Sequence, residues 1–394
     1  KLITLAVAAA MVAPAAAFAE ATLYGTLHQS IDYIDQNDTD VLVVDDDGNI
    51  VPVTIEGWSG WTVSRAEGGI ISGNGPVGPS NRIGVKGSED LGNGLKAIYQ
   101  VEMGVRLNDG DFQPINGDRG SISMRNTFVG LAGNWGTFLV GRHDTPLKIS
   151  TGKLDMFADT MADYNGPLGF NDIRADNAIA YISPSFSGFQ FAGAVHAGGG
   201  ATVEGVRDYD SDSLAEAWSV AGIYSNGPFY GSVAYESLNQ DMTIFNDVVV
   251  VDPITGIPDD LTADFNKWRV GLGILDWNGF SLTGIYEDRE NTSFLNNLDS
   301  SSWQVQAGYA FGNNMIKASY GALDRDTDDD RNLVDDITDF DFDNDLNQWT
   351  VAFDHNFSKR TKVYALYTSI DDDLFPDWDG FSLRSEERRV GKEC

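Results

Sequence analysis

Charged and amide side chains recur at even-numbered positions in one stretch of the chain: Arg82, Lys86, Lys96, Gln100, Glu102 and Arg106. Apolar residues such as Val85 and Val101 occupy odd-numbered positions between them. A row that mixes guanidinium, ammonium, amide and carboxylate groups suits contact with water and dissolved ions. The chemistry it indicates is the solvation and steering of ions, with no bond made or broken.

The spacing of two residues predicts a β-hairpin over residues 81–106, turning at the glycine-rich GSEDLGNG. One of its faces is apolar and the other is charged. The apolar face can lie on the core of a soluble sheet, or it can face lipid in a membrane barrel whose polar face lines a watery lumen. The hairpin alone leaves both alternatives open.

Carboxylates gather in a second stretch, residues 144–174, which shows no clean alternation. They are Asp155, Asp159, Asp163 and Asp172. An irregular segment of roughly 30 residues inside a compact domain usually has a function of its own. We therefore interpret residues 144–174 as a functional loop.

The sequence gives little support for a metal site, a hydrolase site or a phosphate-binding loop. The histidines His28, His143, His196 and His355 are scattered without a metal-binding spacing, and no Ser/His/Asp set can be assembled. The acidic run 326–330 is followed by an arginine where a calcium loop needs glycine, and it lacks the glutamate of such a loop, so we interpret it and the acidic run 45–47 as solvated charge. Glycines fall at turns and at small positions expected to face lipid, not in a phosphate-binding loop. We predict no metal site, no cofactor and no enzymatic activity.

Composition and the two ends of the chain set further limits. The net charge of −33 makes nucleic acid an implausible partner. Residues 1–19 have the apolar run and the small-x-small end of a signal peptide, so the protein is expected to be exported. Residues 384–394, RSEERRVGKEC, break the preceding pattern and resemble the translation of a sequencing adapter, so we expect them not to be native.

Alternating segments joined by tight turns continue along the chain, and long acidic loops separate the hairpins. Trp218, Trp268, Trp303 and Trp349 begin strands beside the long loops. Tyr181, Phe189, Phe229 and Phe280 lie beside the tight turns. Two aromatic girdles and two unequal rims are typical of an outer-membrane barrel.

The strand count also favours a barrel. The pattern gives fifteen strands and the beginning of another at residues 380–383. Because an antiparallel barrel closes with an even number, we predict an all-β transmembrane barrel of sixteen strands, at residues 20–383, with its last strand truncated. Truncation would leave the first strand, Leu23–Tyr33, with an unpaired edge.

These segments together resemble the trimeric, sixteen-stranded general porins of Gram-negative outer membranes. The matching segments are TLYGTLHQSIDY, SNRIGVKGSEDLGNGLKAIYQVE, RNTFVGLAGNWGTFLVGRHDTP, IRADNAIAYISPSFSGFQF and NFSKRTKVYALYTSID. They extend over the mature chain, and the loops diverge. One departure is the end of the chain, where family members close the barrel with a strand that ends in an aromatic residue.

The resemblance implies that residues 144–174 fold into the lumen and constrict it. It implies constriction arginines at Arg82, Arg125 and Arg174, which face acids at Glu102 and Asp155. The alternation separately puts Arg82 and Glu102 on the lumen face. Each arginine could instead form a structural salt bridge that holds the loop. Further lumen candidates are Lys86, Lys96, Gln100, Arg106, Arg142, Asp159, Asp163 and Asp172.

The sequence thus predicts a general diffusion porin that passes ions and small hydrophilic solutes. Its expected partners are two further copies of the chain in a homotrimer, outer-membrane lipid and lipopolysaccharide. The alternative is an exported, acidic, β-rich surface binding protein. Ion selectivity stays open, because constriction arginines favour anions while acidic loops favour cations, most strongly at low salt.

Overall fold

The computed structural model describes most of the chain. The described residues are 20–44, 50–63, 81–105, 107, 122–197, 202–203, 206–207, 213–239, 264–292, 298–327, 345–373 and 376–390. The predicted signal peptide, Arg106 and most of the long acidic loops lie outside this set. The described part of the chain has no helix long and apolar enough to cross a membrane.

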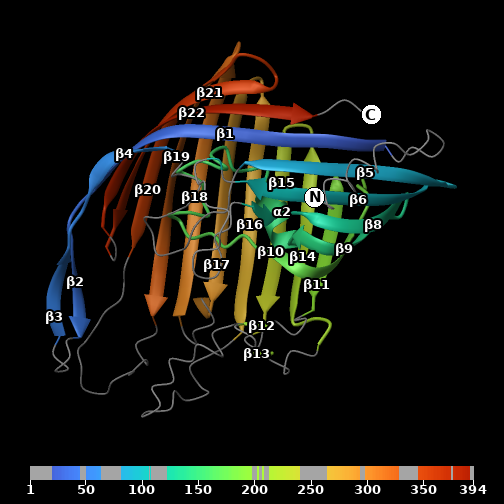
Figure 1. Ribbon diagram of the computed structural model, residues 1–394, viewed down its shortest axis with the longest axis horizontal. Coiled ribbons are helices and arrows are strands. Elements are labelled where there is room, and N and C mark those ends of the chain that lie inside the picture. The colour runs from blue at the N-terminus through green and yellow to red at the C-terminus, as the bar shows by residue number, and fades with distance from the viewer. Residues whose placement is uncertain are drawn as a thin grey trace, which may run out of the picture.

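Sixteen long strands among the described residues form one closed antiparallel barrel. They are β1 (Glu20–Gln36), β5 (Arg82–Gly92), β6 (Leu95–Val105), β8 (Thr127–Gly133), β9 (Gly136–Asp144), β10 (Arg174–Ile182), β11 (Phe189–His196), β14 (Ala217–Asn226), β15 (Phe229–Leu238), β16 (Phe265–Trp277), β17 (Phe280–Glu290), β18 (Leu298–Phe311), β19 (Asn314–Thr327), β20 (Leu346–Asn356), β21 (Thr361–Asp372) and β22 (Trp378–Val390). Figure 1 shows β14 to β20 side by side as a curved wall. The predicted fold class is confirmed.

The prediction of a truncated last strand is wrong for this sequence. Strand β22 pairs with β1 from Tyr24↔Val390 to Gln36↔Trp378, so the first strand has no unpaired edge there. Residues 384–390 can extend the strand because they keep its alternation: Arg384 and Glu386 are buried, whereas Ser385 and Glu387 are exposed. The adapter origin of this peptide stays a prediction.

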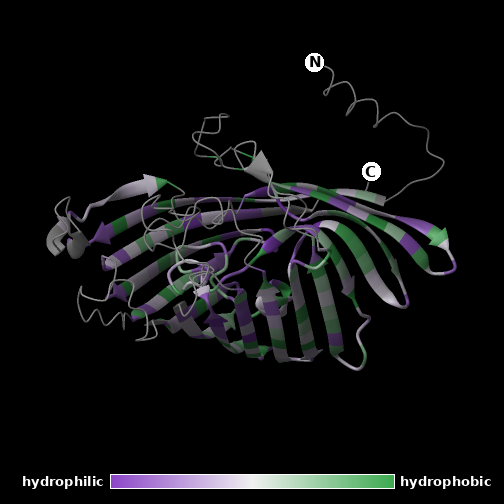
Figure 2. Ribbon diagram, turned by 90° about the horizontal axis from the view of Figure 1, so that it is seen from below, coloured by the Kyte–Doolittle hydropathy of each residue, from purple (hydrophilic) through white to green (hydrophobic). Residues whose placement is uncertain are grey.

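Hydrophobic and hydrophilic residues alternate along the strands (Figure 2), and side-chain exposure follows the inverted pattern of a membrane barrel. On β1, Leu23, Leu27 and Ile31 are exposed, while His28 and Asp32 on the opposite face are buried. The predicted hairpin is present as β5 and β6, with Val85 exposed on its outer face. Apolar exposure outside and polar burial inside distinguish this protein from a soluble β-sandwich.

The aromatic residues at the long-loop rim form cross-strand pairs. Trp218 packs on Tyr235, Trp268 on Tyr286, Trp303 on Tyr320 and Trp349 on Tyr367, with ring centroids 5.1 to 5.5 Å apart. Each pair joins the two strands of one hairpin between β14 and β21. Such rings suit the interface between membrane and water.

Several short elements accompany the sixteen long strands. Residues 36–63 contain a two-stranded hairpin of β2 (Thr39–Val44) and β3 (Ile50–Ile55), and then β4 (Ser59–Val63), which pairs with β1. A short strand β7 (Ile122–Met124) pairs with the end of β6, and β12 (Thr202–Val203) pairs with β13 (Val206–Arg207).

The apolar core lies inside the barrel, between the wall and the loop at 144–174. Leu154, Phe157, Tyr164, Leu168 and Phe170 of this loop are buried. They form one cluster with inward wall residues from β15 to β22, among them Tyr230, Ile285, Leu323, Leu346 and Tyr364. The loop therefore fills one side of the lumen.

The inverted pattern makes a direct prediction for the outward Leu272 of β16, which is 64% exposed. Leu272→Arg is expected to destabilise the barrel by about 2–4 kcal/mol, because a guanidinium would face hydrocarbon. Gln100→Arg on the lumen face is the control and should cost far less, since water reaches it. Urea unfolding from lipid vesicles measures both, and equal losses would contradict this orientation.

Candidate functional site

The loop enters the lumen through a short helix, α2 (Pro146–Thr151), which follows directly after β9. Thr145 caps it by accepting a hydrogen bond from the Lys148 backbone, and Pro146 supplies a favourable first residue. Leu147 packs on the small inward residues Ala221 and Ala234 of β14 and β15. The backbone N–H of Leu147 donates to Ser219 Oγ at 3.0 Å, which directs the helix along the inner wall.

A first charged group lies on the wall opposite the loop. Arg125 Nε donates to Glu102 Oε1 at 2.7 Å, and Tyr24 OH donates to Glu102 Oε2 at the same distance. The ring of Tyr24 lies over Gly84, where a Cβ atom would come within 2.6 Å of it. Glu102 is 7% exposed, so it orients Arg125 and presents little charge of its own to the lumen.

A second group surrounds the root of the loop. Arg174 donates to Asp144 Oδ1 at 2.9 Å and to Asn126 Oδ1 at 2.9 Å. Asn126 in turn donates to the other oxygen of Asp144, and Lys148 lies 3.5 Å from Asp144. Two cations therefore share one carboxylate at this point.

The third predicted arginine meets the tip of the loop. Arg82 of β5 lies 3.3 Å from Asp159 Oδ2, and both side chains are about one-quarter exposed. The backbone carbonyl of Asp159 also accepts a hydrogen bond from Arg384 of β22. The loop thus extends from its root at β9 to the side of the barrel where the first strand, β1, pairs with the last, β22.

The carboxylate expected opposite the arginines, Asp155, is turned to the other wall. It accepts hydrogen bonds from Gln306 of β18 at 3.2 Å and from the Phe157 backbone at 2.8 Å. Leu154 and Phe157 are fully buried on that wall, so Asp155 between them is held there too. Asp159, which was predicted only as a further lumen candidate, meets an arginine instead.

The side chains of Asp163 and Asp172 are also buried away from the open lumen. Asp163 accepts hydrogen bonds from the Asp159 and Asn165 backbones, and Asp172 binds Arg269 of β16 at 2.6 Å. Burial raises the pKa of Asp163 to about 6, helped by the charges of Asp159 and Asp172 and opposed by the backbone donors. Burial would also raise the pKa of Asp172, but the adjacent Arg269 lowers it below its usual value.

The remaining candidates lie around this centre. Lys86 is exposed on the lumen face, 5.3 Å from the Tyr24 ring, and Gln100 donates to the Asn126 carbonyl. Lys96 is exposed beside the β5–β6 turn, opposite Asp90. Arg142 forms an ion pair with the exposed Asp176. The structure does not gather these four residues with the three arginines, and Arg106 lies outside the described residues.

Sequence analysis overlooked the ionic residues of the wall behind the loop. Lys267, Arg269, Glu287, Arg289 and Lys317 are all at most 4% exposed. Arg269 bridges Asp172 and Glu287, and Lys317 pairs with Asp354 at 3.2 Å. Lys267 and Arg269 follow the same spacing of two that identified Arg82 and Lys86, so a full reading of each strand would have found them.

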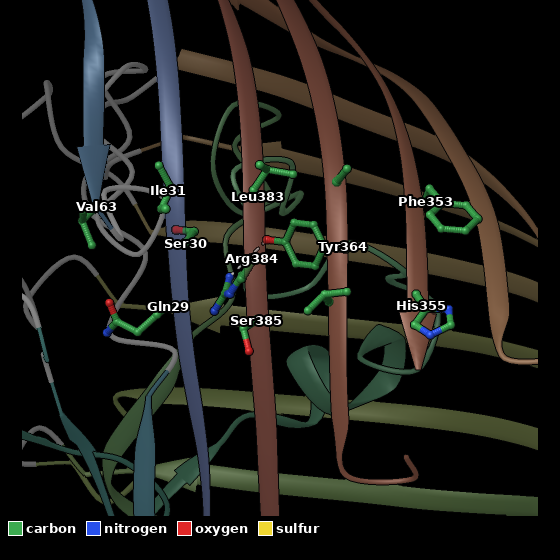
Figure 3. A pocket seen from close by; sticks show the side chains of 12 residues that line it. Gln29, Ser30, Ile31, Val63, Phe353, His355, Tyr364, Leu383, Arg384 and Ser385 are labelled. Carbon is green, nitrogen blue, oxygen red and sulfur yellow. Dashed lines mark hydrogen bonds between the residues drawn. The ribbon is translucent and has the colours of Figure 1, made fainter. Parts of the chain in front are cut away.

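A groove of about 470 Å³ lies outside this site, on the outer face of the barrel (Figure 3). Exposed Ile31 of β1, Leu383 of β22 and Phe353 of β20 line it. They alternate with inward residues such as Ser30 and Arg384, so the groove faces away from the lumen. Among the described residues, no group of His, Cys, Asp and Glu is arranged to hold a metal ion.

Taken together, these positions define a polar lumen that one inward loop narrows from one side. Cationic side chains lie on the β5–β10 wall, and apolar and paired charged groups fasten the loop to the β14–β22 wall. This is the architecture of a porin, a barrel that encloses a water-filled channel.

Comparison with known proteins identifies the family. A sequence model described as Gram-negative porin matches residues 6–373. The chain is 28% identical over 362 residues to the major outer membrane protein P.IB of Neisseria meningitidis serogroup B, covering 89% of this chain and 87% of the relative. It is 28% identical over 301 residues to the outer membrane porin protein 32 of Delftia acidovorans, covering 73% of each.

Among solved structures, an anion-selective porin from Comamonas acidovorans superposes with a TM-score of 0.63 at 19% sequence identity. That alignment covers 94% of this chain and all of the other. The chain belongs to the Gram-negative porin family, and it is an outer-membrane diffusion porin. The alternative of a soluble surface binding protein is thereby excluded.

The raised pKa of Asp163 predicts a pH effect on the stability of the barrel. As the pH falls from 7 to 5, Asp163 takes up a proton and the loop loses one negative charge. Because burial favours the protonated form of this acid in the folded barrel, the unfolding temperature should rise through a step near pH 6 as the pH falls, measured by circular dichroism. Asp163→Asn should abolish the step. An unchanged step in that variant would show that another group titrates there.

Proposed function

We propose that solutes pass between the loop and the β5–β10 wall, through a constriction lined by Arg82, Arg125 and Arg174. This proposal is supported by a difference in exposure to water between two sets of charged side chains. Arg82 and Asp159 keep about one-quarter of their side-chain surface exposed, whereas Arg269 and its partner Glu287 have none. Charges that stay solvated can act on a passing solute, and charges paired out of water cannot.

The balance of these solvated groups favours anions. Four cations line the path, Arg82, Arg125, Lys148 and Arg174, against three carboxylates, Glu102, Asp144 and Asp159. Exposed Lys86 adds a further positive charge on the lumen face. Asp155 and Asp172 do not reverse this balance, because they bind to the wall behind the loop, and Asp163 is buried and hydrogen-bonded within the loop. The structural relative from Comamonas is itself described as anion-selective.

The strongly acidic remainder of the chain acts elsewhere. A net charge of −33 with much of the acid in long loops attracts cations to the mouth of the channel. This attraction extends about 30 Å at 0.01 M salt and only about 3 Å at 1 M. We therefore expect cation preference at low salt and anion preference at high salt, where only the constriction is felt. Passage is passive, and no substrate is turned over.

Reversal potentials in a potassium chloride gradient test this assignment. At high salt, Arg82→Gln should shift the reversal potential toward cations, and Asp159→Asn should shift it toward anions. Lys96→Gln is the matched control, because Lys96 is exposed beside the β5–β6 turn, at the opposite end of this hairpin from Arg82. The assignment fails if the first two variants both keep the wild-type potential.

We further propose a homotrimer in which β1, β5, β6, β8 and β9 face neighbouring copies. Four Trp–Tyr pairs of the long-loop rim lie on β14 to β21, and one further pair, Tyr33 with Trp61, lies on β1 and β4. Outward side chains near that rim on the opposite wall include the exposed aliphatic Ile83, Val101 and Val140. A rim with aromatic anchors suits lipid and lipopolysaccharide, and an aliphatic one suits a protein neighbour.

The trimer predicts a simple electrical signature. Purified protein added to a planar bilayer should insert with conductance steps in groups of three, because three pores enter together. Val140→Arg should reduce the heat-resistant oligomer, since it would place a charge in the interface. Leu282→Arg on β17, outside the proposed interface, is the control for a charge on the outer face. Single steps from wild-type protein would contradict the trimer.

A further inference from the structure

Side chains of the wall donate hydrogen bonds to backbone carbonyls at several points along the loop. Lys317 Nζ donates to the Met156 carbonyl at 2.7 Å, Arg289 to that of Gly169 at 2.9 Å and Lys267 to that of Asn171 at 2.8 Å. Neutral donors continue the series, with Thr283 on the Leu154 carbonyl and Ser302 on the Leu168 carbonyl. Carbonyl groups taken out of water need such donors.

Each of the three cations is also fixed on its wall side. Lys267 lies 2.7 Å from Glu236, Arg289 lies 3.0 Å from Glu287 and Lys317 lies 3.2 Å from Asp354. A buried cation held by a wall carboxylate has a defined position. It therefore sets the distance between the wall and the loop carbonyl that it binds.

Glycines of the wall leave space for side chains of the loop to pack. Gly271 and Gly273 of β16 lie under Leu154, and Gly380 of β22 lies under Met161. A Cβ atom at these glycines would come within 2.5 Å, 2.7 Å and 2.8 Å of the loop side chain. Gly308 and Gly321 contact Met156 and Leu168 in the same way. These five glycines face the lumen, which corrects the expectation that such small positions face lipid.

We propose that this inner wall sets the width of the pore. The glycines determine how deeply the loop sinks into the wall, and Lys267, Arg289 and Lys317 hold it at that depth. Residues that no solute touches would thereby select solutes by size. The inference rests on the proposed role of the loop as the constriction, and it assigns these residues a positioning role in that constriction.

Liposome swelling with a monosaccharide and a trisaccharide tests the proposal. Gly273→Ala should lower trisaccharide entry more than monosaccharide entry, because the added Cβ moves Leu154 and the loop into the pore. Gly284→Ala on β17 is the matched control, since its Cβ would have no neighbour closer than 3.9 Å. Gly273→Ala with Leu154→Ala should restore the wild-type ratio, because the shortened side chain makes room again.

A second variant acts in the opposite direction. Lys317→Met with Asp354→Asn removes the cation and its wall partner together, so no unpaired charge is left in the barrel. It should raise trisaccharide entry relative to monosaccharide entry while heat-resistant oligomer is retained. Leu154→Ala alone should do the same with the wall intact. Wild-type ratios in Gly273→Ala, Leu154→Ala and the Lys317/Asp354 variant would overturn the proposal.

The outcome also separates this inference from the proposed function. If the loop is not the constriction, Arg82→Gln and Asp159→Asn will leave the reversal potential unchanged and the wall variants will leave the sugar ratio unchanged. If only the inference is wrong, the two charge variants will shift the reversal potential while the sugar ratio stays at its wild-type value.

Discussion

The channel depends on the hydrogen bonding of a loop that has been taken inside a barrel. An irregular segment has backbone groups that its own structure does not satisfy, and burial makes each of them costly. Here the wall supplies the partners, from Ser219 at the start of the loop to Lys267 near its end. With the loop held on this side, the proposed solute path lies on the other.

Buried ion pairs are an expensive means of attachment, because the charges must be desolvated. Arg269 is 0% exposed, yet it contacts two carboxylates, Asp172 of the loop and Glu287 of the next strand. Arg289 shares Glu287 and also reaches the loop backbone. Such a network fixes one position of the loop among several that apolar packing alone would allow. For a constriction of constant width, a single defined position of the loop matters more than a gain in the free energy of unfolding.

The same arrangement buries some acidic side chains of the loop and leaves others exposed to water. Acids of the loop that bind the wall are removed from the solute path, and Asp159 at the tip remains beside Arg82. In this strongly acidic chain, the proposed constriction therefore contains more cations than carboxylates. Net charge describes the field at the mouth, and the local pairing describes the field at the narrowest point.

Sequence alone determined the barrel, because its pattern is local. A strand that faces lipid on one side and water on the other must alternate, so Val85, Arg82 and Glu102 could be assigned to faces without coordinates. The count of sixteen strands followed from the same alternation. The prediction of a truncated last strand failed because residues 384–394, which resemble the translation of a sequencing adapter, were left out of the strand, although the alternation of residues 384–390 fits one.

The tertiary structure decided what the loop does. Asp155 and Asp159 have the same chemistry and lie four residues apart, yet one binds Gln306 and the other meets Arg82. The difference arises from contacts between residues far apart in the chain, such as Lys317 with Met156 and Arg269 with Asp172. No local period encodes such contacts, since they depend on which wall the closed barrel brings to the loop.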